Sequence, residues 1–220
     1  MTRIPRMPRS GLTGEQAALY DEIAGGPRAA EPRAVPLVGA DGALEGPFNA
    51  MLVSPGLGRA LQELGATVRY RSPLPARIRE LAILAVARAQ HSAFERRAHE
   101  AAGRAAGLTD SEMAGVAAGE CPATLGPEEA AALACVQALA RRADLSDAEY
   151  AAAVRTLGAE AVFALVTLAG YYSALALQLR VYRVDPAPAG PAGPEPAGNE
   201  PACPDKALAQ DKPGRVEVTG

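Results

Sequence analysis

Tryptophan is absent from this sequence of 220 residues, and aromatic residues make up only 4% of it. Hydrophobic residues nevertheless reach 49%. The core must therefore be built from Ala, Leu and Val, and such small side chains favour closely packed helices. A chain of this length is expected to form one domain, with room for an appended tail.

The chain also has few cysteines and little net charge. The three cysteines, Cys121, Cys135 and Cys203, are widely spaced and none stands in a C-x-x-C arrangement, so neither a disulfide framework nor a zinc site is suggested. The net charge is −3 and the basic residues are scattered, which predicts no nucleic-acid partner. The N-terminal MTRIPRMPRSG has no apolar segment after its basic residues, which argues against a secretory signal and predicts a cytoplasmic protein.

One apolar run is close to the length of a membrane span. Residues 161–179 contain no charged side chain. The run also holds Thr, Gly, Tyr, Ser, Gln and several alanines, and no other segment resembles it. We expect a buried core or interface helix rather than contact with a membrane.

Helix start and stop signals divide the chain into about eight helices. The first is expected from Thr13, which could form a capping box with Gln16, to about Ala24. No stretch alternates with a period of two, so an all-α bundle is predicted. Further helices are expected near residues 48–53, 55–70, 75–89, 92–107 and 127–142. Capping boxes at Thr109 and Ser146 predict two more helix starts, the second of these helices ends near residue 158, and the long apolar helix ends by about residue 182.

Two segments are expected to be irregular. Residues 26–47 hold Pro and Gly at short intervals, and loops of this length are often functional lids, which the sequence alone leaves open here. Residues 186–220 are rich in Pro, Gly and Ala and have almost no large apolar residue, which predicts a disordered tail. The helical domain is therefore expected to cover residues 1–185.

The segment ELAILAVARAQHSAFERRAH, from Glu80 to His99, concentrates the residues that can transfer protons. Ser92, Glu95 and His99 stand at offsets of 0, +3 and +7, which places them on one face of a helix. His99, with an ordinary pKa of about 6.5, suits proton transfer at neutral pH, and Glu95 could orient it. Glu80 heads an apolar run, and burial there would raise its pKa and make it a candidate acid or base.

Each of these residues also has a purely structural explanation. Ser92 and Glu95 form the S-x-x-E pattern of a capping box. Glu95 and His99 could be a surface pair one helical turn apart, and nearby arginines could simply neutralise Glu80. The second histidine, His91, lies in the polar break and is expected to be an exposed loop residue.

Four motifs carry a resemblance to a known family: GPFNAML at 46–52, RIRELAILAVAR at 77–88, FERRAH at 94–99 and GYY at 170–172. With these motifs the chain resembles the carboxymuconolactone decarboxylase family, which shares its helical fold with the alkylhydroperoxidase D proteins. The resemblance implies an alkylhydroperoxidase D-like helical bundle that assembles as a homo-trimer or homo-hexamer.

The sequence departs from the peroxidase branch of this fold at both cysteines. In that branch a Glu, the two Cys of a C-x-x-C pair and a His share the active site, and the matching positions here are Glu80, Ser92, Glu95 and His99. Thiol-dependent peroxide reduction needs an attacking thiolate and a second thiol that resolves the disulfide. A thiol peroxidase is therefore not expected. Arg180 stands where relatives often have Asn, and it could bind a substrate carboxylate or form an intersubunit salt bridge.

Together, the residues and the resemblance predict an enzyme without cofactor or metal that decarboxylates, isomerises or cyclises a small lactone or conjugated carbonyl compound. His99 would be the general acid and base, with Glu95 and Glu80 as the catalytic carboxylates. Ser92, together with the nearby helix N–H groups, would bind the oxyanion that develops during the reaction. The full set expected to bind the substrate is Ser92, Phe48, Asn49, Tyr171 and Arg180.

Two alternatives from other classes stay open. A non-catalytic oligomer could bind a small hydrophobic metabolite at the same place. A residual peroxidase could use Cys121 or Cys135, although Cys135 lies in the apolar ALACVQALA and is expected to be inert.

Overall fold

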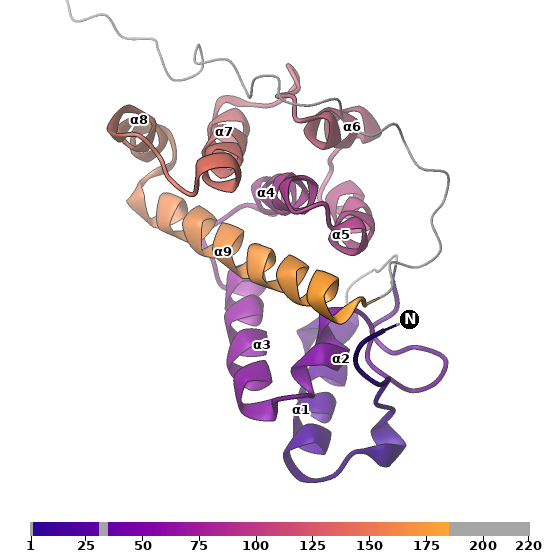
Figure 1. Ribbon diagram of the computed structural model, residues 1–220. Coiled ribbons are helices and arrows are strands. Elements are labelled where there is room, and N and C mark those ends of the chain that lie inside the picture. The colour runs from indigo at the N-terminus through magenta and orange to yellow at the C-terminus, as the bar shows by residue number, and fades with distance from the viewer. Residues whose placement is uncertain (1, 31–34, 185–220) are drawn as a thin grey trace, which may run out of the picture.

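The computed structural model describes residues 2–30 and 35–184 (Figure 1). These residues form nine α-helices and no strand beyond two isolated bridges, so the all-α prediction is confirmed. The predicted tail at 186–220 lies outside the described residues. The elements in chain order are η1 (Arg9–Gly11), α1 (Gly14–Ala24), η2 (Pro27–Ala30), α2 (Pro47–Met51), α3 (Pro55–Tyr70), α4 (Ala76–Ala89), α5 (Ala93–Ala105), α6 (Asp110–Ala118), α7 (Pro127–Arg142), α8 (Asp147–Leu157) and α9 (Ala159–Tyr182).

Helix α4 lies at the centre of one half of the molecule, in contact with α5, α6, α7 and α9 (Figure 1). Its sequence explains this place, because every residue from Glu80 to Ala87 is buried and a helix that is apolar on all faces needs neighbours all round. Glu80 is thereby carried into the core, where it is only 1% exposed.

Helix α9 crosses the molecule between α1–α3 on one side and α4–α8 on the other (Figure 1). Among the described residues it is the one helix long and apolar enough to span a membrane, and half of its most apolar window is buried inside the protein. One face of α9 is therefore buried in the core, as the sequence predicted for this helix. The opposite face leaves Phe163, Val166, Leu177 and Val181 exposed.

Local sequence determines most helix ends. Helices α3 and α7 begin with proline in the first turn, and α6 and α8 begin with the predicted capping boxes at Thr109 and Ser146. The capping box predicted at Thr13 is wrong. Gln16 instead donates from Nε2 to the Leu52 carbonyl at 2.9 Å and so ties α1 to the end of α2.

The two cysteines within the described residues differ. Cys135 is a buried free thiol in α7, and burial raises its pKa to about 11, which disfavours the reactive thiolate. Cys121 is disulfide-bonded, so the expectation of no disulfide is wrong for this residue. Cys203 lies outside the described residues.

Candidate active site

The turn between α4 and α5 brings Glu80 and His99 together. After α4, His91 is exposed, as predicted, and takes a left-handed conformation with φ of 51°. Ser92 then caps α5 by accepting a hydrogen bond from the backbone N–H of Glu95. Because the chain reverses over so few residues, α5 packs back along α4, and His99 Nδ1 lies 2.7 Å from Glu80 Oε2.

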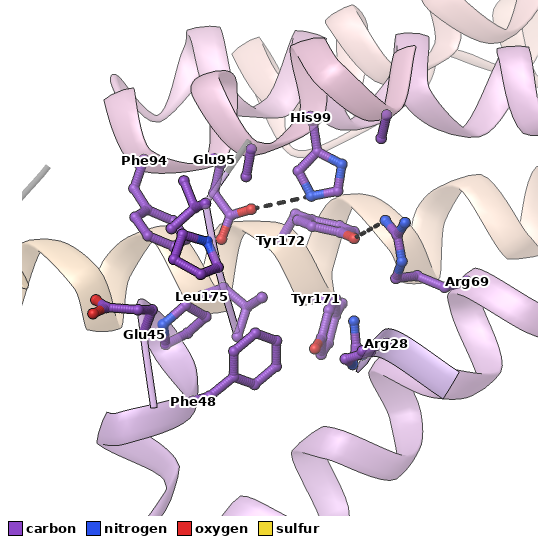
Figure 2. Close-up of a pocket in the computed structure, with 15 residues that line it drawn as sticks. Arg28, Glu45, Phe48, Arg69, Phe94, Glu95, His99, Tyr171, Tyr172 and Leu175 are labelled. Atoms are coloured by element: carbon purple, nitrogen blue, oxygen red, sulfur yellow. Dashed lines mark hydrogen bonds and ion pairs between the residues drawn. The ribbon is translucent and has the colours of Figure 1, made fainter. Parts of the chain in front are cut away.

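His99 lies between two carboxylates. Its Nδ1 faces Glu80, and its Nε2 lies 3.4 Å from Glu95 Oε2, the contact drawn between these residues in Figure 2. Glu80 is 1%, Glu95 4% and His99 7% exposed. The imidazole therefore connects a carboxylate of the core helix to one on its own helix, and all three groups are shielded from water.

The charges of this cluster decide its protonation. Burial alone would lower the pKa of His99, but the charge and hydrogen bond of Glu80, with the hydrogen bond of Glu95, raise it. Burial alone would raise the pKa of Glu80, but His99, Arg69 and Arg79 lower it. The predicted rise in the Glu80 pKa is therefore wrong, because cationic neighbours outweigh desolvation. The structure favours an imidazolium beside a carboxylate.

Two arginines hold Glu80 from the other side. Arg69 is 7% exposed, and its Nη1 lies 3.6 Å from Glu80 Oε1 and donates to the Tyr172 hydroxyl at 3.3 Å. Arg79 donates from Nε to the same Glu80 oxygen at 3.4 Å. The Tyr172 ring packs edge-on against His99 with centroids 5.2 Å apart. These contacts leave Glu80 and the imidazole little freedom to rotate.

A cavity of about 60 Å³ opens beside this cluster (Figure 2). Glu95 and His99 line it, whereas Glu80 lies behind His99 and does not. The second oxygen of Glu95, Oε1, is buried and has no hydrogen-bond partner among the described residues. The other lining residues are Arg28, Val35, Pro36, Glu45, Pro47, Phe48, Arg69, Phe94, Ala98, Ala102, Tyr171, Tyr172 and Leu175.

The structure places two of the five predicted substrate-binding residues in the cavity wall. Phe48 and Tyr171 both line it. Ser92 does not, because its hydroxyl faces the first turn of α5 and accepts the Glu95 N–H at 3.4 Å. The structural explanation of Ser92 as a helix cap is therefore confirmed, and the oxyanion role has no geometric support.

Asn49 and Arg180 also lie away from this cavity. Asn49 is buried, but its side chain accepts from the Met7 N–H and donates to the Pro5 carbonyl, each at 3.0 Å, and so fastens the N-terminal segment. Arg180 is exposed and donates to Gln90 Oε1 at 3.0 Å. Neither residue is in place to contact a molecule in the cavity.

Sequence reasoning missed the two arginines of the cavity wall. A signal for Arg69 existed, because it lies on the buried stripe of α3, where a charged residue needs a partner from another helix. Arg28 lies in η2, the short element after α1, where no hydrophobic periodicity predicts that its side chain is buried. The buried residues of α3 are Gly58, Gln62, Gly65, Val68 and Arg69.

Glu80, Glu95 and His99 do not form a metal site. Within residues 2–30 and 35–184, no group of three His, Cys, Asp or Glu side chains is arranged to hold a metal ion. The two carboxylates face different ring nitrogens of His99, so the three groups do not converge on one point.

The described helices form an all-α fold of the alkylhydroperoxidase D type. A solved structure described as the alkylhydroperoxidase AhpD core, an uncharacterized peroxidase-related protein from Ralstonia eutropha JMP134, is similar with a TM-score of 0.67 and 16% sequence identity. The likeness covers 84% of this chain and 92% of that one, and at this identity it shows the fold alone.

The sequence of the central helices is similar to a known family. Residues 55–138, which contain Glu80, Glu95 and His99, match the model of the Carboxymuconolactone decarboxylase family. The predicted resemblance is thereby confirmed. No curated protein matches the chain.

Proposed function

We propose that this protein is an acid/base enzyme, independent of cofactors, that decarboxylates, isomerises or cyclises a small lactone or conjugated carbonyl compound. One observation carries the proposal: the buried series Glu80, His99, Glu95 reaches the cavity wall, and Glu95 there has a buried carboxylate oxygen, Oε1, with no hydrogen-bond partner among the described residues. A buried acceptor left unpaired costs about 1–3 kcal/mol, and a bound molecule that supplies a donor would recover it.

In this proposal the roles are divided differently from the sequence prediction, in which Glu95 orients His99. Glu80 makes the shorter contact with His99 and is itself held by Arg69 and Arg79, so Glu80 is the orienting carboxylate. Glu95 and the Nε2 side of His99 share a proton at the cavity. Together they are the groups that exchange it with a substrate.

This arrangement suits reactions that pass through an enolate. In decarboxylation the electron pair of the broken C–C bond moves into the conjugated carbonyl as carbon dioxide leaves, and an acid then protonates the carbon. In isomerisation the same pair of groups removes a proton from one carbon and returns it to another. The positive charge favoured on His99 would stabilise the enolate oxygen in a site shielded from water.

The test is a reaction followed in D₂O with compounds that accumulate in cells lacking the gene. Loss of carbon dioxide, read by mass spectrometry, would identify a decarboxylase. Unchanged mass apart from deuterium, placed by NMR, would identify an isomerase or cyclase.

Glu95→Gln and His99→Ala should each slow the reaction by about 100-fold or more without unfolding the protein. Glu100→Gln is the matched control, because Glu100 is on α5 but pairs with Arg96 at the surface. Full activity in His99→Ala would disprove the role of the imidazole. Tight binding without conversion or exchange would favour a metabolite-binding oligomer instead.

A further inference from the structure

Residues 37–45 form a short hairpin beside the cavity. The Glu45 N–H donates to the Leu37 carbonyl at 3.0 Å, and the backbone of Val38 pairs with that of Leu44 in an isolated bridge. The residues of this hairpin and its flanks that line the cavity are Val35, Pro36, Glu45 and Pro47. The hairpin therefore closes part of one side of the cavity.

One arginine of the N-terminal segment holds this hairpin by charge. Arg6 Nη2 donates to Asp41 Oδ1 at 2.8 Å and to Glu45 Oε1 at 2.7 Å. A Cβ at Gly39 would collide with all three of these side chains, so they converge on one point of the hairpin. Two carboxylates this close repel each other unless a cation lies between them. Arg6 therefore stabilises the closed shape of the hairpin.

The N-terminal segment is itself fixed to the body of the protein. On either side of Arg6, Asn49 of α2 accepts from the Met7 N–H and donates to the Pro5 carbonyl, each at 3.0 Å. Asn49 is buried, whereas the side chains of Arg6 and Asp41 are 40% and 45% exposed. Water and salt screen exposed ion pairs. The contact that breaks most readily is thus the one between Arg6 and the hairpin.

The hairpin meets the opposite wall of the cavity through an apolar contact. Gly46, directly after the hairpin, has φ of 61°, and a Cβ there would collide with the ring of Phe94 from α5. Figure 2 shows Phe94 and Glu45 at the same end of the cavity. Among the described residues, no hydrogen bond or ion pair joins the hairpin to α5 or α9, while the Tyr20 hydroxyl ties the Gly42 carbonyl at its tip to α1. The cavity end of the hairpin can therefore leave Phe94 without breaking a polar contact.

We propose that Arg6 is a latch. While it holds Asp41 and Glu45, the hairpin closes the cavity at Phe94, and its release lets the hairpin move so that a small molecule can enter or leave. This goes beyond the proposed function, because an enzyme and a metabolite-binding protein both need access to the cavity. It also assigns the lid that the sequence left open within 26–47 to residues 37–45.

A cysteine in the cavity wall of the full-length chain measures this access without any substrate. Ala98→Cys places a thiol on the α5 side of the cavity, and peptide mass spectrometry separates its alkylation by iodoacetamide from that of the native cysteines. Adding Arg6→Gln should raise the alkylation rate at least about threefold, the effect of losing an exposed ion-pair network. Arg6→Lys should raise it less, because an ammonium still pairs with the carboxylates. High salt should raise the rate when Arg6 is present and have little effect in Arg6→Gln.

Three variants complete this experiment. Arg59→Gln is the matched control and should leave the rate unchanged, because Arg59 is a surface arginine that pairs with Glu22 of α1 at 3.0 Å. A thiol introduced by Ala93→Cys, at an exposed position of α5, should react equally fast with and without Arg6→Gln. Asp41→Asn releases the latch from the hairpin side, covers the case in which Arg6→Gln does not fold, and should also speed alkylation of the cavity thiol.

Hydrogen exchange followed by mass spectrometry separates release of the latch from a general loss of stability. In Arg6→Gln the exchange should become faster in residues 37–45 and stay unchanged in α7. An alkylation rate that neither Arg6→Gln nor Asp41→Asn alters would overturn the proposal, and so would faster exchange in α7 as well. None of these measurements uses turnover, so their failure is distinguishable from a failure of the proposed function, which is read from conversion alone.

Discussion

Side chains far apart in the sequence determine the charge state of His99. Its ring contacts Glu80 at 2.7 Å, and Glu80 in turn contacts Arg69 from α3 and Arg79 from α4. Removing one member of a buried ion pair typically costs about 3–5 kcal/mol, because the other charge is left without compensation. The cluster therefore links the chemistry of the site to the stability of the fold.

The first prediction concerns pH. The raised pKa of His99 means that its contribution to the free energy of unfolding is complete below its ordinary pKa of 6.5 and is lost as the pH rises through the raised value. The lowered pKa of Glu80 means that its contribution is complete above 4.5 and is lost as the pH falls through the lowered value. The pair should therefore stabilise the protein most between these two ordinary pKa values.

Urea unfolding of the wild type and of His99→Gln measures this contribution. The amide of Gln can donate to Glu80 but cannot carry the titrating charge. The difference in the free energy of unfolding should be largest near about pH 5.5 and should shrink by about pH 8.5. A difference that does not change with pH would mean that the pKa of His99 is the same in the folded and unfolded protein, and a difference that grows as the pH rises would mean that His99 is neutral in the folded protein.

At the scale of elements, α3 is shaped by its glycines. Gly58 allows the backbone of α2 to approach, and Gly65 makes room for Tyr171 of α9 and for Arg28. Glycine lowers the intrinsic stability of a helix by about 1 kcal/mol relative to alanine. Its presence at these two positions therefore indicates that close packing outweighs helix propensity.

The second prediction follows from this packing. In Gly58→Ala the Cβ would collide with the backbone oxygen of Met51 and lie 2.9 Å from Leu19 Cδ2, and a backbone atom cannot rotate away. We expect a loss of about 1–3 kcal/mol from overpacking, which exceeds the gain in propensity. The same change at Gly56, where the space is open, should leave stability unchanged or raise it by up to about 1 kcal/mol. Chemical denaturation of the two variants distinguishes them, and equal effects would contradict the packing argument.

At the scale of the whole molecule, the outer face of α9 is an apolar surface that no other described residue covers. Phe163 is 74% and Leu177 55% exposed, and Val166 and Val181 lie on the same face. A row of large apolar side chains on one helix indicates an interaction surface. We propose that copies of this chain pack together through this face, in the trimer or hexamer that the family resemblance implies.

The third prediction tests this assembly. Phe163→Glu and Leu177→Glu should each lower the molar mass measured by light scattering after size-exclusion chromatography, because a charge would be buried in the interface. Tyr150→Glu changes an exposed aromatic residue of α8, 52% exposed, and should leave the mass unchanged. A wild-type protein that elutes as a monomer would contradict the proposal.

The sequence by itself determined the helices and part of the site. The capping boxes at Thr109 and Ser146 and the apolar α4 depend on residues within a few positions of one another, and all were predictable. The same holds for the spacing of Glu95 and His99 on one helix. These features are local, so neighbouring residues suffice to specify them.

Only the tertiary structure decided how the site is charged and what else lines it. The direction of the Glu80 pKa depends on Arg69 and Arg79 as well as on His99, and burial alone predicted the opposite sign. The place of Arg28 in the cavity wall could not be predicted from the sequence. Arg180, which was expected to bind the substrate, is exposed instead. The reason is physical: electrostatic energies and cavity walls depend on distances between groups remote in sequence, and these distances are set only when the helices pack.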